Sequence, residues 1–219
     1  MECILSLKNL TYKTTEKLIL NNVSLNVMEK DFITITGPSG SGKTTILRLI
    51  NNLISATDGT ILYKNKNINE YNPIDLRKSI SLCFQMPHLF GETVWDNLSF
   101  PFKIRKINPD TEKILIYLNK LNLGEEYLKK DIRNLSGGEK QRISIIRSLL
   151  FNPDILLLDE ITSALDDENS ILVEEMICEL NVHGSTILWI THNKSQDNRL
   201  GNRSILIENS KITEDFKNE

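Results

Sequence analysis

The chain has 219 residues, a formal net charge of −3 and 3 cysteines. The length suits one α/β domain with a sizeable core, and the mildly acidic balance argues against a broad surface for nucleic acid. Residues 1–8 show no basic segment followed by a long apolar core, and no apolar run approaches the roughly 20 residues that a membrane-spanning helix needs. We therefore expect no secretory signal and no nucleic-acid partner, and a role at a membrane only through a partner that spans it.

The three cysteines, Cys3, Cys83 and Cys178, lack the spacing of a metal site. We expect reduced thiols in a cytosolic protein. The abundance of Lys, Asn and Ile is interpreted as a bias of genome composition.

Strand patterns dominate the beginning of the chain. Residues 4–12 and 18–27 are predicted strands, and residues 32–36 form a third that ends at Gly37. Residues 44–54 then have helical apolar spacing through Ile46, Leu49, Ile50 and Leu53. Strand, glycine loop and helix follow one another in the order that a phosphate-binding loop requires.

Residues 37–44, the phosphate loop, match G-x-x-x-x-G-K-[ST] at every fixed position. Glycines let successive backbone N–H groups point inward at phosphates, and the helix that follows adds its positive end. Lys43 is placed to reach the β- and γ-phosphates, and the Thr44 hydroxyl suits Mg²⁺. The predicted nucleotide-binding residues here are Gly37, Pro38, Ser39, Gly40, Ser41, Gly42, Lys43, Thr44 and Thr45. Tyr12, at the end of the first strand, is a candidate to stack on a base, although a lone Tyr is usually a packing residue.

The middle of the chain changes from strands to helices. Residues 59–63 and 80–84 are predicted strands, and residues 91–134 are mainly helical, with a helix start at Asn108-Pro109. The residues Ile114, Leu115, Leu118 and Leu121 give that helix one apolar face. This stretch is the candidate for a subdomain inserted in the α/β core. Gln85 stands between the strand and the insertion, where its amide is placed to contact a metal ion or an attacking water.

Residues 135–141, the serine–glycine segment, place Ser136, Gly137 and Gly138 just ahead of a helix. Such a segment is a second phosphate-binding element. One chain rarely needs two such elements for one phosphate tail. We therefore expect each to serve a different nucleotide, shared between two copies of the protein.

The end of the chain supplies carboxylates and a histidine. Residues 155–158 are apolar on both faces, as in a central parallel strand, and Asp159 and Glu160 follow at the strand end where ligands bind. We expect Asp159 to hold Mg²⁺ and Glu160 to orient or deprotonate the attacking water. A helix at residues 166–182, a strand at residues 186–190 followed by His192, and a hairpin over residues 204–212 complete the chain. His192 is placed to hydrogen-bond a γ-phosphate.

Together these segments resemble the ATP-binding cassette (ABC) ATPases over essentially the whole chain. Six motifs stand in the family's order: Walker A at residues 37–44, the Q-loop at Gln85, the signature at residues 135–141, Walker B at residues 155–160, the D-loop at residues 163–166 and the switch histidine at His192. The resemblance implies an α/β P-loop NTPase fold with a mixed sheet core, an N-terminal antiparallel β subdomain and an inserted α-helical subdomain. It also implies one ATP-binding domain over residues 1–219, with the helical subdomain at about residues 86–150.

The resemblance implies ATP and Mg²⁺ as cofactors, and ATP hydrolysis with Glu160, His192, Gln85 and Lys43 as catalytic residues. Thr44, Gln85 and Asp159 would be the metal contacts. Two copies would dimerise head to tail when ATP binds, so that residues 136–138 of one copy contact the γ-phosphate held by the other.

A separate membrane subunit, the permease, is implied as a partner. It would dock near residues 85–105, where Leu89, Phe90, Val94 and Trp95 are candidates either for docking or for packing of the helical insertion. The protein would then be cytoplasmic and peripheral on the inner face of the cell membrane.

A more specific resemblance is to the ATPase subunits of bacterial Fet-type (Ybb-type) iron exporters. Residues 83–105, 159–166 and 187–192 carry it, including Ile161 where many ABC ATPases have Pro. It implies a role in iron export. Because the ATPase contacts the membrane subunit and not the cargo, the residues leave the cargo and the direction of transport open.

Two other classes explain less of the chain. A P-loop kinase of a small molecule would account for residues 37–44 but leaves residues 135–141 and 163–166 unexplained. A soluble ABC ATPase of DNA repair or translation needs a long coiled coil or tandem cassettes, and neither pattern is present in the sequence.

Overall fold

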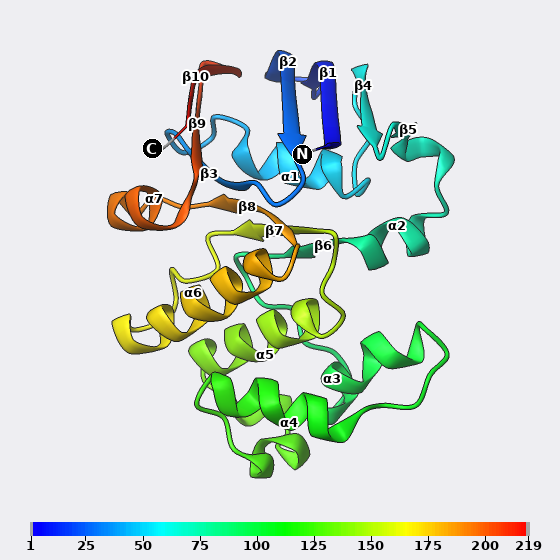
Figure 1. Cartoon of the computed structure of the whole chain (residues 1–219), viewed down its shortest axis with the longest axis vertical. Coiled ribbons are helices and arrows are strands. Elements are labelled where there is room, and N and C mark those ends of the chain that lie inside the picture. Colours follow the sequence, from blue (N-terminus) through cyan, green and yellow to red (C-terminus); the bar gives the residue numbers. More distant parts are fainter. Residues whose placement is uncertain (1, 218–219) are drawn as a thin grey trace. The chain divides into compact units, whose positions relative to one another are not determined.

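Two compact units make up the chain in the computed structural model, which describes residues 2–217 (Figure 1). The first unit holds Met1–Leu82, Pro153–Asp159 and Asn181–Glu219, and the second holds Cys83–Asn152 and Glu160–Leu180. Among the helices of the described residues, none has the length and apolar character of a membrane span.

The first unit contains two sheets. One is antiparallel in the order β2-β1-β4-β5, and the other is mixed in the order β10-β9-β3-β8-β7-β6. In the second sheet β3 runs parallel to β8 and β9, β7 runs parallel to β8, and β10 is antiparallel to β9. The strands are β1 (Cys3–Lys13), β2 (Leu18–Met28), β3 (Phe32–Thr36), β4 (Asp58–Tyr63), β5 (Lys66–Asn67), β6 (Ile80–Cys83), β7 (Ile155–Asp159), β8 (Thr186–Ile190), β9 (Arg203–Glu208) and β10 (Lys211–Lys217).

One apolar core joins both sheets of the first unit to the helix α1 (Lys43–Ile50). Ile46, Leu47, Leu49 and Ile50 of that helix are buried with residues from β1, β2, β3, β7, β8 and β9. β7 and β8 are buried at every position, which explains why their sequences are apolar on both faces. The short helices α2 (Pro73–Ser79), α7 (Lys194–Leu200) and η1 (Ile68–Glu70) complete this unit.

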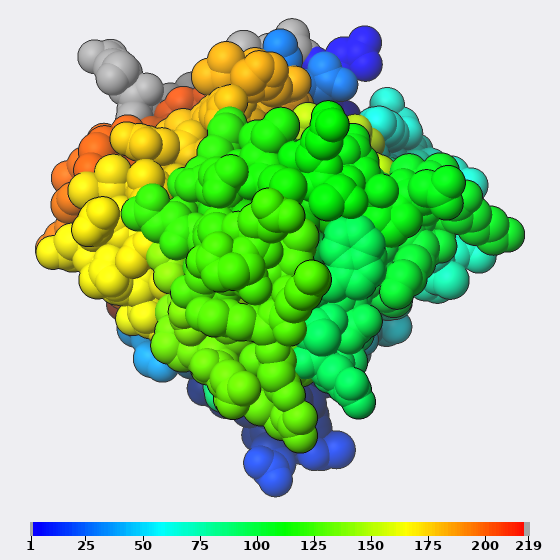
Figure 2. Space-filling model, turned by 90° about the horizontal axis from the view of Figure 1, so that it is seen from below, coloured from blue at the N-terminus to red at the C-terminus, as the bar shows by residue number. Residues whose placement is uncertain are grey.

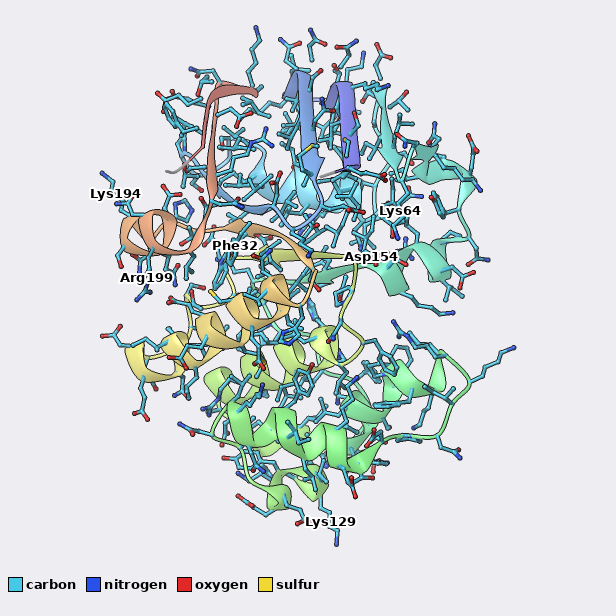
Figure 3. All side chains as sticks on the ribbon, viewed as in Figure 1. Phe32, Lys64, Lys129, Asp154, Lys194 and Arg199 are labelled. Atoms are coloured by element: carbon cyan, nitrogen blue, oxygen red, sulfur yellow. The ribbon has the colours of Figure 1, made fainter. Side chains whose placement is uncertain are left out.

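Polar contacts hold the end of β4 to the segment that leads into β7. Lys64 and Asp154 form an ion pair at 2.8 Å, and the two side chains lie close together in Figure 3. The Tyr63 hydroxyl donates a hydrogen bond to the same carboxylate. Burial and this hydrogen bond raise the pKa of Tyr63 to about 12, so its hydroxyl stays a donor at neutral pH.

The second unit is helical. Its elements are α3 (Val94–Lys103), α4 (Thr111–Lys120), η2 (Glu125–Lys129), η3 (Ile132–Asn134), α5 (Gly137–Leu149) and most of α6 (Asp167–Val182). The face in Figure 2 is formed largely by side chains of α3, α4 and α5, drawn in greens. The centre of the unit is apolar and buried, with Leu98 and Phe102 from α3, Leu118 from α4 and Ile146 from α5 all at most 2% exposed.

The predicted α/β architecture is confirmed, with a mixed sheet beside an N-terminal antiparallel sheet. The predicted C-terminal hairpin is also confirmed: β9 and β10 pair antiparallel, and Asn209 and Ser210 between them have φ of 50° and 66°, as the twist of a tight hairpin requires. The division of the whole chain into one domain with an insertion stays a prediction.

Several predicted boundaries were wrong. α1 ends at Ile50 and not at residue 54, because Asn51 turns its amide to donate to the Ile80 carbonyl at 2.6 Å and Asn52 has φ of 53°. Leu53 is accordingly 42% exposed. α4 begins at Thr111, with the Asp110 carboxylate as its cap, so Pro109 precedes the helix and is not in its first turn.

Many left-handed turns are made without glycine. In the described part of the chain, 12 residues other than Gly have positive φ, and 7 of these are Asn. Asn tolerates this conformation better than most residues because its short side chain hydrogen-bonds locally. Some of these Asn residues lie in turns between elements, and others lie at irregularities within a strand, as Asn22 does in β2.

Candidate functional site

Three strand ends of the first unit lie at one edge of the mixed sheet. Ile190 of β8 is in register with Ile35 of β3 on one side and with Asp159 of β7 on the other. Gly37 comes directly after β3, and His192 comes two residues after β8. Because these strands are parallel, the phosphate loop, the Asp159 carboxylate and His192 start from the same edge, which is where ligands of open α/β sheets bind.

The backbone of the phosphate loop requires glycine at two crowded positions. Gly37 has φ of 135°, and a Cβ atom there would lie 2.1 Å from the Ile207 carbonyl oxygen. Gly42 has φ of 106°, and a Cβ there would lie 2.7 Å from a methyl carbon of Leu20. Both conformations are rare for residues that carry a Cβ. Gly42 is also the cap of α1, so the loop leads directly into the positive end of that helix.

Lys43 is held with its charge at the loop. The residue is 5% exposed, and its Nζ donates to the carbonyl oxygens of Gly37 and Pro38, both at 2.9 Å. The hydroxyl of Ser41 is buried and has no hydrogen-bond partner among the described residues. A buried donor without a partner is costly, so this loop fits a ligand with acceptor oxygens, such as phosphate.

Thr44 connects the loop to β7. Its hydroxyl donates to the Asp159 carboxylate at 3.1 Å, and Asp159 is 4% exposed. Among the described residues no three His, Cys, Asp or Glu side chains form a metal cluster. A single carboxylate beside a hydroxyl fits Mg²⁺ that shares its ligands with phosphate oxygens and water, because Mg²⁺ seldom uses an all-protein cage.

The remaining predicted residues of the first unit lie in α1, in β1 and just after β8. Thr45 is half-buried in the first turn of α1. Tyr12 is half-buried near the end of β1 and packs against the core. His192 is exposed just after β8, between Thr191, whose hydroxyl donates to Gln196 at 2.5 Å, and Asn193, whose side chain caps α7.

Glu160 begins the second unit and makes a contact that the sequence did not indicate. Gln85 donates through Nε2 to the Glu160 carboxylate at 2.9 Å. Glu160 has φ of 49°, an uncommon value for Glu. Its carbonyl accepts from the Ser163 amide at 3.1 Å and from the Ser163 hydroxyl at 2.8 Å, so the conformation is held from both of its ends.

The serine–glycine segment forms the capped start of α5. Ser136 is the cap, its hydroxyl accepts from the Glu139 amide at 3.2 Å, and the Ser136 amide donates to the Glu139 carboxylate at 2.7 Å. Gly137 and Gly138 are the first two helical residues. The S-x-x-E spacing is the signal of this reciprocal cap and was available in the sequence.

Glu139 is held by two further side chains. The Tyr127 hydroxyl donates to it, and Lys130 lies 3.5 Å from it and 3.5 Å from the centre of the Tyr127 ring. The hydrogen bond from Tyr127 is the main cause that lowers the pKa of Glu139 to about 2, followed among the lowering effects by the Ser136 amide. The carboxylate is therefore ionised at neutral pH and already occupied by donors.

The segment after Glu160 packs beside the start of α5. A Cβ on Gly138 would lie 3.5 Å from a methyl carbon of Leu165. Farther along α5, Arg142 donates to Asn169, which itself donates to Asp166. The predicted D-loop and the serine–glycine segment are therefore neighbours within the second unit.

The candidate docking residues divide between surface and core. Phe90 is 41% exposed, and Met86 and Phe100, which the sequence did not single out, are 72% and 40% exposed. Leu89 and Trp95 are half-buried. Val94 is fully buried at the start of α3, so the docking interpretation of Val94 was wrong and its packing alternative is correct.

Comparisons with known proteins place these features in context. A family model described as "ABC transporter" matches residues 20–163. The chain is 45% identical over 196 residues to the probable iron export ATP-binding protein FetA of Escherichia coli (strain K12), covering 89% of this chain and 87% of that protein. It is 32% identical over 227 residues to the phosphate import ATP-binding protein PstB of Borreliella burgdorferi, covering 98% and 87%. A dimeric ATP-binding cassette, solved in a post-hydrolysis state with ADP and Pi, superposes with a TM-score of 0.87 at 31% identity, covering 98% of this chain and 99% of that one.

Proposed function

The chain belongs to the ABC transporter family as an ATP-binding, ATP-hydrolysing subunit, and on that premise we propose that it is a motor closed by two shared MgATP molecules. In this proposal two copies associate head to tail, and closing and reopening of the dimer drives a separate membrane subunit. Relatives that are ATP-binding proteins of transporters and cassettes solved as dimers support both partners in general terms.

Nucleotide binding is assigned to the first unit. The amides of residues 37–42 and the positive end of α1 take up the β- and γ-phosphates, and Lys43 and Thr45 complete the cradle. Tyr12 stacks on adenine. Thr44 and Asp159, joined at 3.1 Å, hold Mg²⁺, which when bound neutralises charge on the phosphate oxygens.

Hydrolysis is assigned to residues that surround the γ-phosphate. Glu160 orients the attacking water and accepts its proton, while the P–O bond to ADP breaks and the leaving oxygen takes the negative charge. Gln85 already contacts the Glu160 carboxylate at 2.9 Å. From there it positions that water and would contact Mg²⁺. His192 donates to the γ-phosphate. Ser136, Gly137 and Gly138 contact the γ-phosphate bound by the other copy.

The observation that carries this proposal is the alignment of three strand ends at one edge. Residue register puts Ile35, Ile190 and Asp159 side by side. Lys43 and Asp159 carry opposite charges, and each residue is at most 5% exposed. MgATP carries phosphate oxygens that attract the Lys43 ammonium and a cation that attracts the Asp159 carboxylate, so both charges suit this ligand.

The test is the solution mass of the Glu160→Gln protein by light scattering, with and without MgATP. The amide oxygen of Gln still accepts from Gln85, so the site keeps its shape while the base is lost. We expect a monomer without nucleotide and a dimer with MgATP, and Glu160→Gln/Ser136→Arg should bind MgATP but stay monomeric. A double variant that dimerises as well as its parent would refute the shared site.

The membrane subunit is proposed to dock near residues 85–105, with the protein held peripherally at the inner face of the cell membrane. The exposed side chains of Met86, Phe90 and Phe100 support this surface. The Phe90 and Phe100 rings stack edge to face at 4.8 Å between centres and offer an apolar patch to a cytoplasmic segment of the permease.

Iron export is the proposed transport process, because the relative named for iron export is 45% identical to this chain. Phosphate import is the second candidate, since a relative of that name matches 98% of the chain. Cells that carry only the Glu160→Gln form should accumulate iron, measured by elemental analysis, if the transporter exports it. Unchanged iron with reduced phosphate uptake would favour the importer.

A further inference from the structure

The helix α5 contacts the segment that follows β6 at two points. This segment, residues 84–93, is called the linking loop and precedes α3. Gln141 donates to the Phe84 carbonyl at 3.3 Å, and Arg147 donates through one guanidinium nitrogen to the His88 carbonyl at 2.9 Å. α3 also packs directly against α5 (Figure 1). The linking loop is therefore held to the helix whose first turn carries the serine–glycine segment.

Arg147 holds the loop by more than one contact. Its second terminal nitrogen donates to the Asn97 side chain at 2.9 Å, and the guanidinium lies 5.2 Å from the centre of the Phe90 ring. Asn97 is fully buried, accepts from the Phe90 amide at 3.1 Å, and donates to the Phe90 carbonyl at 2.8 Å and the Thr93 carbonyl at 3.0 Å. Arg147 and Asn97 together are called the arginine clamp.

The arginine clamp stabilises the helix–loop contact less than apolar packing would. Burial lowers the pKa of Arg147 below its ordinary value, so the charge is partly desolvated there. A buried charge is rarely the most stabilising choice where an apolar side chain would pack. The planar guanidinium, however, fixes two acceptors and one ring in a single geometry. The clamp therefore favours precise placement of the linking loop over stability.

The clamp and the cap of α5 are connected by continuous helix. Ser136 and Arg147 are 11 residues apart on an element that runs unbroken from Gly137 to Leu149. At a rise of about 1.5 Å per residue, this puts the clamp roughly 16 Å along the axis from the cap. The helix is thus an unbroken physical connection between its first turn and the residues that hold the loop.

We propose that Arg147 is a positioning residue that couples nucleotide contact at Ser136–Gly138 to the conformation of the linking loop, and through it to the surface offered to the membrane subunit. The proposal rests on the proposed function, because it takes the serine–glycine segment as a nucleotide contact made in the dimer. It identifies the backbone of His88 and Phe90 as the part of the loop that responds. Phe90 then connects the two roles, with its ring beside Arg147 and 41% of the residue exposed.

The test is hydrogen–deuterium exchange of the full chain in the Glu160→Gln background, with and without MgATP, read on peptides that cover residues 84–93. The substitution is Arg147→Lys, which keeps the charge but cannot reach both acceptors with one fixed geometry. In the parent we expect MgATP to slow exchange of the loop at least about fivefold, within the usual range of coupling between sites. In Arg147→Lys the slowing should fall below about twofold, while light scattering still reports the dimer.

A matched control is Arg77→Lys. Arg77 also donates to two backbone carbonyls, of Asn51 at 3.3 Å and Asn52 at 2.8 Å, but belongs to the first unit. It should leave the response of the linking loop to MgATP unchanged.

Three outcomes overturn the coupling. If Arg147→Lys raises loop exchange equally with and without MgATP, so that the slowing persists, Arg147 only stabilises the fold. If the parent dimerises without any slowing in residues 84–93, the coupling is refuted without recourse to the variant, even if that variant does not fold. If the parent stays monomeric with MgATP, the shared site of the proposed function fails first, and light scattering separates that result from the other two.

Discussion

Alanine at Gly37 and at Gly40 should have different effects, although both residues lie in the phosphate loop at positive φ. Gly37 has φ of 135° and Gly40 has φ of 76°, so each alanine adds backbone strain of about 1–3 kcal/mol. At Gly37 the new methyl group would also lie 2.1 Å from the Ile207 carbonyl oxygen, whereas at Gly40 nothing lies within 4 Å. Because a carbonyl in a strand cannot rotate away, overpacking adds about 1–3 kcal/mol at Gly37 alone.

Urea unfolding of the two variants measures this difference. With an m-value of about 3 kcal/mol/M, a difference of about 2 kcal/mol moves the midpoint by roughly 0.7 M. Gly37→Ala should therefore unfold at clearly lower urea than Gly40→Ala. Equal midpoints, or a lower midpoint for Gly40→Ala, would refute the argument that contact between the loop and β9 sets the need for glycine.

Three further predictions concern catalysis, dimerisation and pH. Glu160→Gln should lower kcat by about 10²- to 10⁴-fold, the range for loss of a general base, with the Kd for MgATP by equilibrium titration nearly unchanged; a parallel rise of Kd would mean that Glu160 serves binding. Ser136→Arg should keep MgATP binding by the monomer, because loss of the cap costs only about 1 kcal/mol, yet abolish the steep dependence of hydrolysis on protein concentration; hydrolysis that survives unchanged would contradict the shared site. Tyr127→Phe removes the donor that contributes most to lowering the pKa of Glu139 to about 2. A carboxyl whose pKa is lowered on folding stabilises the protein above its unfolded pKa of about 4.3, and this stabilisation is lost as pH falls toward 2. In thermal unfolding, this variant should therefore lose less stability than the parent between pH 7 and pH 3. An equal loss would exclude Tyr127 as the cause.

The phosphate loop and its flanking elements were predictable because their signals are local. A strand pattern, two glycines at fixed spacing and an amphipathic helix act within 20 neighbouring residues. The end of α1 was not predictable in this way. The apolar spacing continues to Leu53, but the helix stops at Ile50, because Asn51 is drawn to a carbonyl of Ile80 that is distant in sequence.

The site shows the same limit. The positions of Asp159 and Glu160 followed from an apolar strand that ends in carboxylates, but the contact between Gln85 and Glu160 spans 75 residues. Arg147 reads as one more basic residue on a helix, and only the fold brings it to His88 and Asn97. For Val94 the sequence suggested a surface role that the fold does not give it. This apolar residue begins α3 and is fully buried, so it belongs to the core.

Asparagine at the left-handed turns affects which substitutions the sequence tolerates there. Glycine at such a position would relieve the strain of positive φ but would also give the unfolded chain more freedom to lose. The two effects oppose each other, so exchange between Asn and Gly at Asn22, Asn122 or Asn209 is expected to be nearly neutral for folding. A genome that enriches Asn codons is therefore able to place them at these turns at little cost. Gly37 of the phosphate loop, where the Ile207 carbonyl leaves no room for a Cβ, is closed to the same exchange.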